Sequence, residues 1–574
     1  KKKENVPFVS KLQQQTIEIT GIVKDNTGEP IIGANIILKG SNTGVITDMD
    51  GRYAIKVLSP KSVLVVSYIG YIPQEVTVGN RSVLNIELSP STESLDEVVV
   101  VGYGTQKKVN LTGSVQNISN RDLSKRSASN TSVALQGLAP GVSVVTSSGR
   151  PGYDGAGITI RGTGSLNSST SPLVLIDGVE GYMNFIDINT IESISVLKDA
   201  ASASIYGSRA SNGVILITTK RSKEQPIKVT YSGYVGYNTP TELPDPVNAI
   251  EYMEAVNLAN SNAGANQTYS NDLIEQYKTL GADNLNRYET NWRKEIINDK
   301  ALTHNHSVSI TGGSKDISVF ANAAYYYQDG NISNNNYDRM TLRLNTDARI
   351  TDWMKVGVDV NIRQSKVVRP AFDTPESIIN KATTFVPIFS GINSDGTWGY
   401  GQNGDNPIAT SKVSGLHTAT TPELGLKGFV TINPFKGFDM TASYSSSRLE
   451  DKTDFFINPY DTYEYGVYKT TFPATGTQKN EAWGQKMSNE FNAQASYEKQ
   501  IKGSYFKVLG GMHTSEKSGR SFDATRTGFD FIGFEDLNNG DIATATNNGS
   551  HWDWSMLSYF SRINYRSEEH TSEL

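Results

Sequence analysis

Cysteine is absent from the 574 residues of the sequence. This excludes disulfide bonds, thiolate metal sites and cysteine nucleophiles. A basic excess is absent too, because 53 Lys and Arg stand against 59 Asp and Glu and give a formal net charge of −6. Nucleic-acid-binding domains normally carry a positive excess, so we expect no nucleic acid among the partners.

Long apolar runs are also missing. Hydrophobic residues make up 37% of the sequence, and no stretch approaches the roughly 20 apolar residues that a membrane-spanning helix needs. The sequence therefore excludes a helical membrane protein. It does not exclude a transmembrane β-barrel, because the strands of a barrel wall alternate polar and apolar residues.

Catalytic and cofactor motifs are likewise missing. The phosphate-binding pattern G-x-x-x-x-G-K-[ST] does not occur, and the G-x-G pairs in VGYGTQ and IRGTGS lack the helix that phosphate binding needs. Of the six histidines only His304 and His306 are close in sequence, and a pair without a third ligand is a weak metal signal. We predict that the protein is not an enzyme and holds no cofactor and no metal.

Short strand patterns separated by turns are abundant in the first part of the chain. From Thr16, TIEITGIVKD alternates polar and apolar residues, NTGEP predicts a turn, and further short strands follow up to SVLNIELSP. This spacing predicts a small β-sandwich over residues 16–90. Residues 1–15 are polar and basic and are predicted to form a tail.

Residues 109–222 mix short strands with one helical piece. GITIRGTGS and SPLVLIDGVE are strand-and-turn units. In TIESISVLKDAASASIYGSRASNGVILITTK, a strand is followed by an Ala- and Ser-rich helical turn, a glycine turn and a second strand. We predict an α+β domain here.

Residues 223–565 repeat an alternating pattern. One side of MTLRLNTDARI carries Met340, Leu342, Leu344, Ala348 and Ile350, and the other carries Thr341, Arg343, Asn345, Asp347 and Arg349. The next run sets Val356, Val358, Val360 and Ile362 against Gly357, Asp359, Asn361 and Arg363. Alternation alone fits both a soluble sandwich and a barrel wall. Repetition, long irregular connections and aromatic clusters such as YYYQ favour a barrel, with wall strands of ~9–11 residues.

Four consecutive valines, Val98 to Val101, lie in SLDEVVVVGYGTQKK between the predicted sandwich and the α+β domain. An exposed run of this kind pairs readily with another strand edge. Either it forms the last strand of the sandwich, or a partner is meant to pair with it.

Several of these segments resemble known families. GIVKDNTGEPIIGANIILKGSNTGVITDMDGRYAI, followed by VLVVSYIGY, resembles the carboxypeptidase-regulatory-like domain. VLIDGV, ITIRGTGSLN and IESISVLKDAASASIYGSRASNGVILITTK resemble the plug domain of TonB-dependent outer-membrane transporters, specifically of the SusC/RagA branch. The expected fold is mainly β: an N-terminal sandwich, an α+β plug over 109–222, and the N-terminal part of a large antiparallel transmembrane β-barrel over 223–565, which is incomplete.

This resemblance implies TonB-dependent import of oligomeric nutrients across the outer membrane, with glycan oligosaccharides as the first choice of cargo and peptides as the second. It implies TonB with ExbB–ExbD, a SusD-like surface lipoprotein and outer-membrane lipid as partners. The sandwich and plug would face the periplasm and the lumen. Two alternatives stay open: a transporter that also signals through a missing N-terminal domain, and a non-transporting surface β-protein or adhesin.

The linker over residues 91–108 occupies the position of the TonB box in the resembling family. The resemblance carries that role to Asp96, Glu97, Val98, Val99, Val100 and Val101. The chain has no nucleotide motif of its own, so we expect the work of transport to arrive mechanically through this strand. Addition to a periplasmic sheet would supply backbone hydrogen bonds for affinity and side chains for register.

Candidate cargo contacts lie in two polar loops of the plug, SSGRPGYDG and GTGSLNSST. They are Arg150, Tyr153, Asp154 and Asn167. Aromatic, amide and charged groups suit oligosaccharides or peptides, and hydrogen bonding between plug and wall is an equally open role for them.

Both ends of the chain are expected to be cut. A plugged transporter barrel has about 22 strands, whereas residues 223–565 supply roughly ten. RSEEHTSEL, over residues 566–574, resembles the translation of a sequencing-library adapter and is expected to be an artefact. The tail over 1–15 resembles the exit from an upstream domain.

Overall fold

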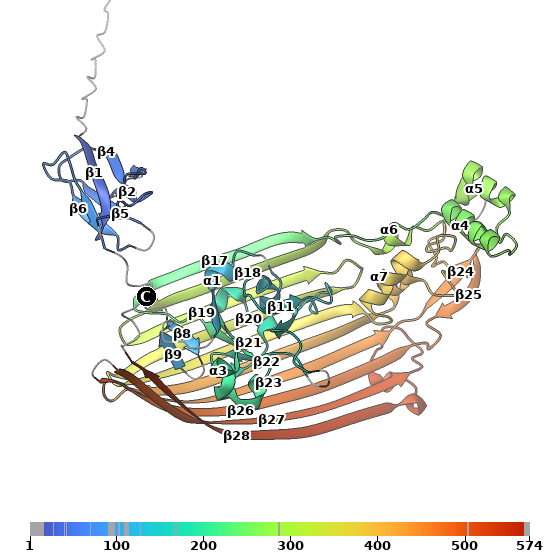
Figure 1. Cartoon of the computed structure of the whole chain (residues 1–574). Helices are drawn as coiled ribbons and strands as arrows, with labels where there is room; N and C mark the ends of the chain where they lie inside the picture. The colour runs from blue at the N-terminus through green and yellow to red at the C-terminus, as the bar shows by residue number, and fades with distance from the viewer. Residues whose placement is uncertain are drawn as a thin grey trace, which may run out of the picture. The chain divides into compact units, whose positions relative to one another are not determined.

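The computed structural model describes residues 17–26, 28–39, 41, 43–68, 71–89, 98–101, 104–107, 114–126, 128–165, 167, 169–284, 288–501 and 504–567. These residues divide into an N-terminal unit and a larger unit that holds the α+β domain and a ten-stranded sheet. The chain is mainly β, as predicted (Figure 1).

The N-terminal unit packs two small sheets over one core. One sheet has the order β4–β1–β7 and the other β3–β2–β5–β6. Alternate residues of β1, among them Ile19 and Val23, are fully buried and join Ile36 and Leu64 in the core. Gly21 lets β1 approach the facing chain, since a Cβ there would lie 1.9 Å from the carbonyl oxygen of Leu84. The strands are β1 (Ile17–Asp25), β2 (Asn35–Leu38), β3 (Gly44–Ile46), β4 (Arg52–Val57), β5 (Val63–Ser67), β6 (Gln74–Thr77) and β7 (Ile86–Leu88).

The α+β domain is built on a five-stranded mixed sheet in the order β10–β15–β16–β13–β14. Its core contains Ile191, Ile194 and Ile215, all fully buried. The strands are β10 (Val115–Ser119), β13 (Leu173–Ile176), β14 (Val179–Glu180), β15 (Ile191–Leu197) and β16 (Val214–Thr219), with a separate pair β11 (Val142–Val145) and β12 (Gly157–Ile160). The helical pieces are α1 (Asn120–Leu123), α2 (Thr131–Ala134), η3 (Met183–Phe185), η4 (Ile188–Thr190), α3 (Ala200–Ala203) and η5 (Ser204–Ala210).

The predicted Ala- and Ser-rich helical turn is α3 with η5. Asp199 begins α3, and its Oδ1 accepts a hydrogen bond from the Ser202 N–H at 2.8 Å. An N-cap of this kind satisfies a backbone donor that the first helical turn leaves unpaired. The capped turn leads the chain from β15 back to its antiparallel neighbour β16.

The ten-stranded sheet, called the wall below, pairs every strand antiparallel with the next in the order β17–β18–β19–β20–β21–β22–β23–β26–β27–β28. This agrees with the predicted count of about ten strands. The bounds are β17 (Gln225–Asn238), β18 (Ala301–Gly313), β19 (Ile317–Asp329), β20 (Asn336–Thr351), β21 (Met354–Pro370), β22 (Leu416–Ile432), β23 (Phe438–Ile457), β26 (Gln478–Ile501), β27 (Ser504–Thr527) and β28 (Thr546–Arg566).

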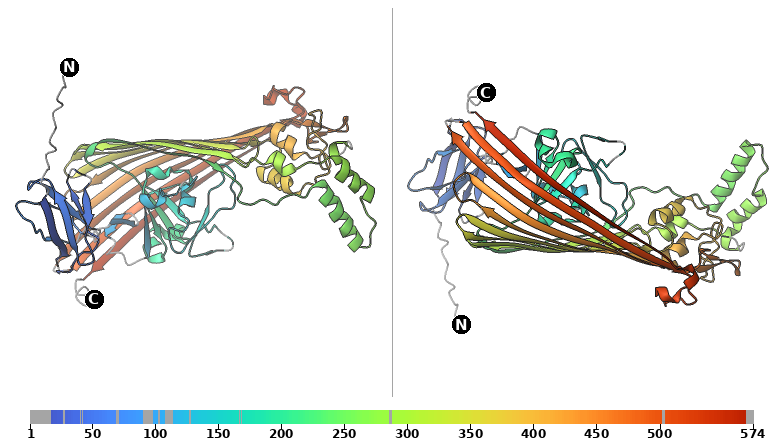
Figure 2. Two further views of the ribbon diagram at one scale, coloured as in Figure 1. Left: turned by 90° about the horizontal axis from the view of Figure 1, so that it is seen from above. Right: turned by 90° about the horizontal axis from the view of Figure 1, so that it is seen from below.

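The wall has an apolar exposed face and a polar covered face. On β20, Met340 is 60% exposed, whereas Arg343 and Asp347 are buried. On β21, Val358 is 50% exposed and Asp359 is buried. The α+β domain, called the plug below, lies against the polar, concave face (Figure 2). This is the inverse of a soluble sandwich and matches a wall whose outer face meets lipid.

The expected strand length was wrong. The wall strands run from 13 to 24 residues, longer than the ~9–11 residues that cross a hydrocarbon layer. Several strands continue past the length that a membrane requires. The additional residues carry the sheet toward the helices at one of its ends.

Helices and a hairpin gather beyond one end of the wall, called the helical end below (Figure 1). The elements are α4 (Ala249–Asn262), α5 (Asn271–Asn284), α6 (Trp292–Ile296), α7 (Pro375–Thr384), α8 (Pro407–Val413), β24 (Tyr460–Glu464) and β25 (Val467–Phe472). Trp292 of α6 packs with Ile378 of α7 and Ile408 of α8 in one buried cluster. The connection between the first two wall strands, β17 and β18, holds α4, α5 and α6. No helix in the described ranges is long and apolar enough to cross a membrane.

Candidate functional site

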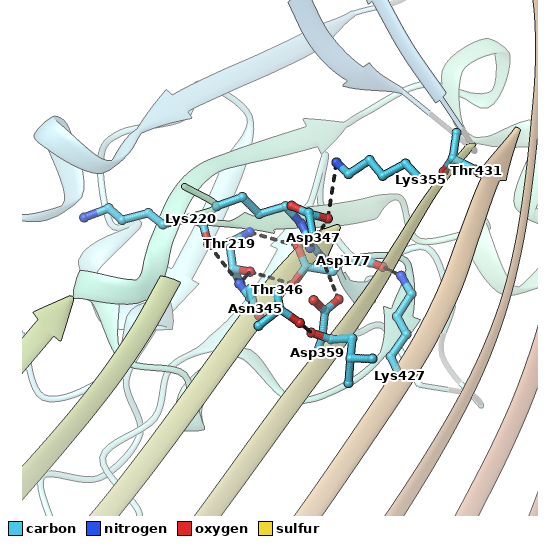
Figure 3. A network of polar contacts seen from close by, with 12 residues as sticks. Asp177, Thr219, Lys220, Asn345, Thr346, Asp347, Lys355, Asp359, Lys427 and Thr431 are labelled. Carbon is cyan, nitrogen blue, oxygen red and sulfur yellow. Dashed lines mark hydrogen bonds and ion pairs between the residues drawn. The ribbon is translucent and has the colours of Figure 1, made fainter. Parts of the chain in front are cut away.

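The turn between β13 and β14 brings Asp177 to the wall (Figure 3). Its carboxylate accepts hydrogen bonds from the Thr219 N–H at 2.9 Å and the Thr219 hydroxyl at 2.7 Å. Nη2 of Arg343 on β20 donates to the same carboxylate at 2.5 Å, and Nζ of Lys427 on β22 donates to the Asp177 carbonyl at 2.5 Å. One aspartate therefore joins the end of the plug sheet to two wall strands.

Asp177 is buried, and its charge is balanced by its neighbours. Burial alone would raise the pKa of Asp177, but the positive charges of Arg343 and Arg221 and the hydrogen bonds from Thr219 hold that pKa below its usual value. The carboxylate is therefore ionised at neutral pH. Charge-assisted hydrogen bonds of this kind are shorter and stronger than neutral ones.

Arg221 occupies the junction between the last plug strand, β16, and the first wall strand, β17. Its Nη1 lies 3.2 Å from Oδ1 of Asp347 on β20, and its Nη2 lies 2.6 Å from Oδ2 of Asp359 on β21. Burial would lower the pKa of Arg221, but the carboxylates of Asp359 and Asp177 raise it. Lys355 adds a second cation 3.2 Å from Asp347.

Neutral hydrogen bonds support the same stretch of the plug. Nδ2 of Asn345 on β20 donates to the Thr219 hydroxyl at 2.8 Å and to the Lys220 carbonyl at 2.8 Å. Asp177, Arg221, Arg343, Asn345, Asp347 and Asp359 are called the anchor network below. It can hold the plug firmly, because removing one partner of a buried pair leaves an uncompensated charge that costs about 3–5 kcal/mol.

A second contact joins the plug to a distant part of the wall. Glu180 of β14 lies 2.8 Å from Nζ of Lys517 on β27 and 3.3 Å from Nη1 of Arg209 within the plug. The short hairpin β13–β14 thus carries two charged contacts, one through Asp177 and one through Glu180. It touches wall strands that are far apart in the sheet order.

A third contact joins a plug loop to the helical end. Nη1 of Arg150 lies 3.2 Å from Oε2 of Glu376, in the first turn of α7. The Arg150 guanidinium carbon also lies 3.7 Å from the centre of the Tyr153 ring, within the range of a cation–π contact. A direct ion pair therefore links the plug to a helix outside the wall.

The four predicted cargo residues have different surroundings. Arg150 and Tyr153 lie together, and Tyr153 is 52% exposed. Asp154 is 8% exposed, and its Oδ1 accepts from Nδ2 of Asn130 inside the plug at 2.6 Å. Asn167 is exposed in another loop, where its N–H donates to the Ser165 hydroxyl at 3.3 Å. All four stay predictions, and Arg150 with Tyr153 is the pair that the fold brings together.

The valine run Val98–Val101 is strand β8, and it pairs with β9 (Gly104–Lys107) in a two-stranded sheet of their own. Neither sheet of the N-terminal unit includes β8 among its described strands. Asp96 and Glu97 lie outside the described residues. The role of this segment as a TonB box stays a prediction.

The partners in the anchor network could not be predicted from the sequence pattern. Alternation placed Arg343, Asp347 and Asp359 on the polar face of the wall without a partner, and no pattern singled out Arg221. The available signal was the presence of full charges on the covered face of a strand, since buried charges are usually paired.

The part of the chain that the structure describes contains no candidate metal site. No group of three or more His, Cys, Asp or Glu side chains there is arranged to hold a metal ion. Within the predicted histidine pair, Nδ1 of His306 lies 2.8 Å from the Tyr231 hydroxyl on β17.

Two family models match the chain. The model of the CarboxypepD_reg-like domain matches residues 19–100, and the model of the TonB-dependent Receptor Plug Domain matches residues 107–214. The first match reaches into the valine run and the second begins just after it. The plug match covers the five-stranded sheet up to the start of β16.

Curated relatives extend the match beyond these domains. TonB-dependent receptor SusC of Bacteroides thetaiotaomicron is 39% identical over 364 residues, which cover 61% of this chain and 34% of the relative. TonB-dependent receptor P26 of Formosa agariphila is 30% identical over 557 residues, which cover 94% of this chain and 53% of the relative. The chain thus spans 34% and 53% of the length of these two relatives.

Solved structures share the arrangement of plug and wall. The RagAB peptide importer in its open-open state aligns with a TM-score of 0.70 at 25% identity, over 82% of this chain and 55% of that one. The closed-closed state aligns with a TM-score of 0.68 at 24% identity, over 80% and 54% of the two chains, which shows a shared fold.

Proposed function

Because the chain belongs to the SusC/RagA-type TonB-dependent receptors of the outer membrane, we propose that it imports oligomeric nutrients by TonB-dependent displacement of its plug. The matched proteins are named as receptors and importers. We therefore assign transport and no catalytic step to this chain.

The observation that carries the proposal is the position of the plug on the polar face of the wall. The anchor network joins the two through buried charged pairs. Opening a pore that is blocked in this way costs free energy, because separating a buried ion pair leaves a charged group buried without its partner. Once separated, the same pairs can form again, so the blockage is reversible.

We assign the helical end to the cell exterior. The wall strands are joined by short turns at the opposite end, for example residues 352–353 between β20 and β21 and 433–437 between β22 and β23. At the helical end the connections are longer, apart from residues 330–335 between β19 and β20, and they include α4 to α8. Outer-membrane barrels have short periplasmic turns and longer extracellular loops.

We assign the pull on the plug to Asp96, Glu97 and Val98–Val101 as a TonB box. In a two-stranded sheet each strand keeps one free edge, so β8 can accept a further strand from TonB while it pairs with β9. Each added backbone hydrogen bond contributes a net ~0.5–1.5 kcal/mol, which gives a reversible grip. TonB would act with its ExbB–ExbD motor.

Oligosaccharides are our first choice of cargo and peptides the second. Hydroxyl and amide groups of Ser445, Ser447 and Asn361 line a cavity between the β13–β14 hairpin and the wall, together with the exposed ring of Tyr182. This mixture suits a ligand rich in hydroxyl groups. The similarity to the RagAB peptide importer supports peptides, and it also supports a SusD-like surface lipoprotein as partner.

The experiment compares two double variants of the valine run. Val98→Pro with Val100→Pro removes two backbone N–H donors, whereas Val98→Thr with Val100→Thr keeps both donors and the β-branched shape. We expect the proline pair to abolish uptake of labelled oligosaccharides and peptides and capture of the TonB C-terminal domain, and the threonine pair to keep both. Uptake that survives the proline pair would overturn the assignment.

A further inference from the structure

Arg369 and His417 lie side by side on the polar face of the wall, near its helical end. They are directly opposite residues of β21 and β22. Directly opposite residues of an antiparallel pair project to the same face. Arg369 is six residues from Arg363, and side chains two residues apart share a face, so both arginines point toward the plug side.

Arg369 makes no direct ion pair with a carboxylate among the described residues. Among the described residues, its Nη1 donates to two backbone carbonyls, those of Pro370 at 3.1 Å and Asp373 at 3.3 Å. The side chain is half-buried. The plug loop that carries Arg150 lies against this part of β21, since a Cβ at Gly152 would lie 3.0 Å from the Val367 side chain. Within the described residues, Arg150 forms an ion pair with Glu376, whereas Arg369 has no carboxylate as a direct partner.

Other carboxylates near this neighbourhood are already engaged. Oδ2 of Asp373 and Oδ2 of Asp405 each lie 2.6 Å from Nζ of Lys381. Oδ2 of Asp454 lies 2.7 Å from Nζ of Lys479. Each of these three carboxylates is therefore held by a lysine ammonium group, and among the described residues none of them forms a direct ion pair with Arg369 or Arg150.

Hydrogen-bonding capacity is also left over here. Nε of Arg150 and Nδ1 of His417 are buried and have no hydrogen-bond partner among the described atoms. Buried polar atoms are rarely left unpaired, so each needs an explanation. A guanidinium group without a direct ion pair and two unpaired nitrogen atoms, all within the described residues, are features that an anion would satisfy together.

We propose that Arg369, Arg150 and His417 form a subsite for an anionic group of the cargo, such as a carboxylate or a sulfate. The planar guanidinium groups present paired donors that match such an anion. The exposed Tyr153 ring beside Arg150 offers an apolar surface for the part of the cargo next to the anion. This inference rests on the proposed import function and narrows its substrate class.

The anion would compete with Glu376 for Arg150. When the cargo group takes over Arg150, the ion pair between the plug loop and α7 is lost. Arrival of an acidic cargo at the helical end would then release one of the three charged contacts that hold the plug. Glu376 acts in this scheme as an internal stand-in for the cargo anion.

The test is isothermal titration of the purified receptor in detergent with two matched pairs of probes. Hexagalacturonate is compared with neutral maltohexaose, and a glutamate-containing hexapeptide with an amidated C-terminus is compared with its glutamine counterpart. Comparison of the saccharide pair with the peptide pair shows whether the receptor binds the anionic group on a saccharide or on a peptide. We expect Arg369→Gln to weaken binding of an acidic probe about tenfold or more and to leave the neutral probe unchanged.

Two further variants separate recognition from structural damage. Glu376→Gln removes the internal competitor, so it should tighten binding of the acidic probe. Arg448→Gln removes the same charge from the opposite face of β23, where Arg448 is 53% exposed, and should change nothing. Equal binding of acidic and neutral probes, or no binding of any acidic probe, overturns the subsite. Capture of TonB by the valine run is measured separately, so either proposal can fail alone.

Discussion

Arg343 of wall strand β20 donates to the carboxylate of Asp177 in the plug at 2.5 Å, although 166 positions separate the two residues in the chain. Both side chains are 9% exposed. This pair lies at the centre of the anchor network, with Arg221 and Lys427 close by. It lets the attachment of the plug be tested one charge at a time.

Asp177→Asn should loosen the plug. The substitution keeps the shape of the side chain but leaves the Arg343 guanidinium buried without its counter-charge, a change that costs about 3 kcal/mol or more. We expect outer-membrane permeability to vancomycin to rise in cells that produce the variant receptor.

The control for this experiment is Asp352→Asn. Asp352 is exposed in the turn between β20 and β21, and surface substitutions usually change stability by less than about 0.5 kcal/mol. If both variants admit vancomycin equally, the anchor network is not what holds the plug.

Acid should weaken the same attachment, but only at low pH. The pKa of Asp177 is held below its usual value in the folded protein. Its contribution to stability is therefore complete above the unfolded pKa of about 3.9 and is lost as the pH falls through the lower folded value. Thermal unfolding of the purified receptor should show no loss from this group between about pH 7 and 5. The difference between wild type and Asp177→Asn should shrink below about pH 4, and a difference that stays constant there contradicts the assignment.

Lys381→Met should open the helical end. Lys381 lies 2.6 Å from both Asp373 and Asp405, and burial, which alone would lower its pKa, is outweighed by these two carboxylates, which raise it. Without the cation, the two carboxylates face each other and repel. We expect protease cleavage between residues 385 and 406 to become about tenfold faster if the pair contributes ~1.4 kcal/mol.

Lys412→Met on α8 is the matched control, because Lys412 is exposed and is in the last turn of its helix. Its cleavage pattern should match that of the wild type. If residues 385–406 are cleaved as slowly in Lys381→Met as in Lys412→Met, Lys381 does not stabilise this segment.

Gly152→Val should displace the plug loop that carries Arg150. Gly152 has φ of +76°, and a Cβ there would lie 2.7 Å from the Tyr337 ring and 3.0 Å from Val367. A side chain at this position is strained by its backbone and also collides with β20 and β21. Because the sequence lacks cysteine, a single Ser147→Cys substitution can carry a spin label that reports the motion of the loop.

Gly149→Val serves as the control in the same labelled background. A Cβ at Gly149 meets no atom within 4 Å. We expect the spin-label spectrum to become more mobile only in the Gly152 variant. Identical spectra for the two variants would mean that the loop does not depend on its fit against the wall.

Local patterns in the sequence predicted much of this architecture. Alternation assigned Met340 and Val358 to one face and Arg343 and Asp359 to the other, and the structure confirms both faces. The helical turn that follows β15 was also predicted, from its Ala- and Ser-rich residues, and the structure has α3 there. Such features depend on neighbours that are close in the chain.

Contacts between distant segments could not be predicted in the same way. Arg221 meets Asp347 and Asp359 across 126 and 138 positions, and Arg150 meets Glu376 across 226. These meetings depend on the register of the whole wall and on where the plug lies within it. Alternation shows which face a residue occupies, but it does not identify the residue that comes to face it.

The order of strands in the plug sheet implies an order of detachment. β10, the strand of this sheet nearest to the valine run in sequence, lies at one edge of the sheet, and within the described residues its one partner strand is β15. β16 lies at the centre of the sheet. The junction that follows it contains Arg221, which forms an ion pair with Asp359 of the wall. A pull from the N-terminal side can therefore separate β10 from the sheet first, while the remaining strands stay attached to the wall. Those strands then form the edge on which β10 pairs again.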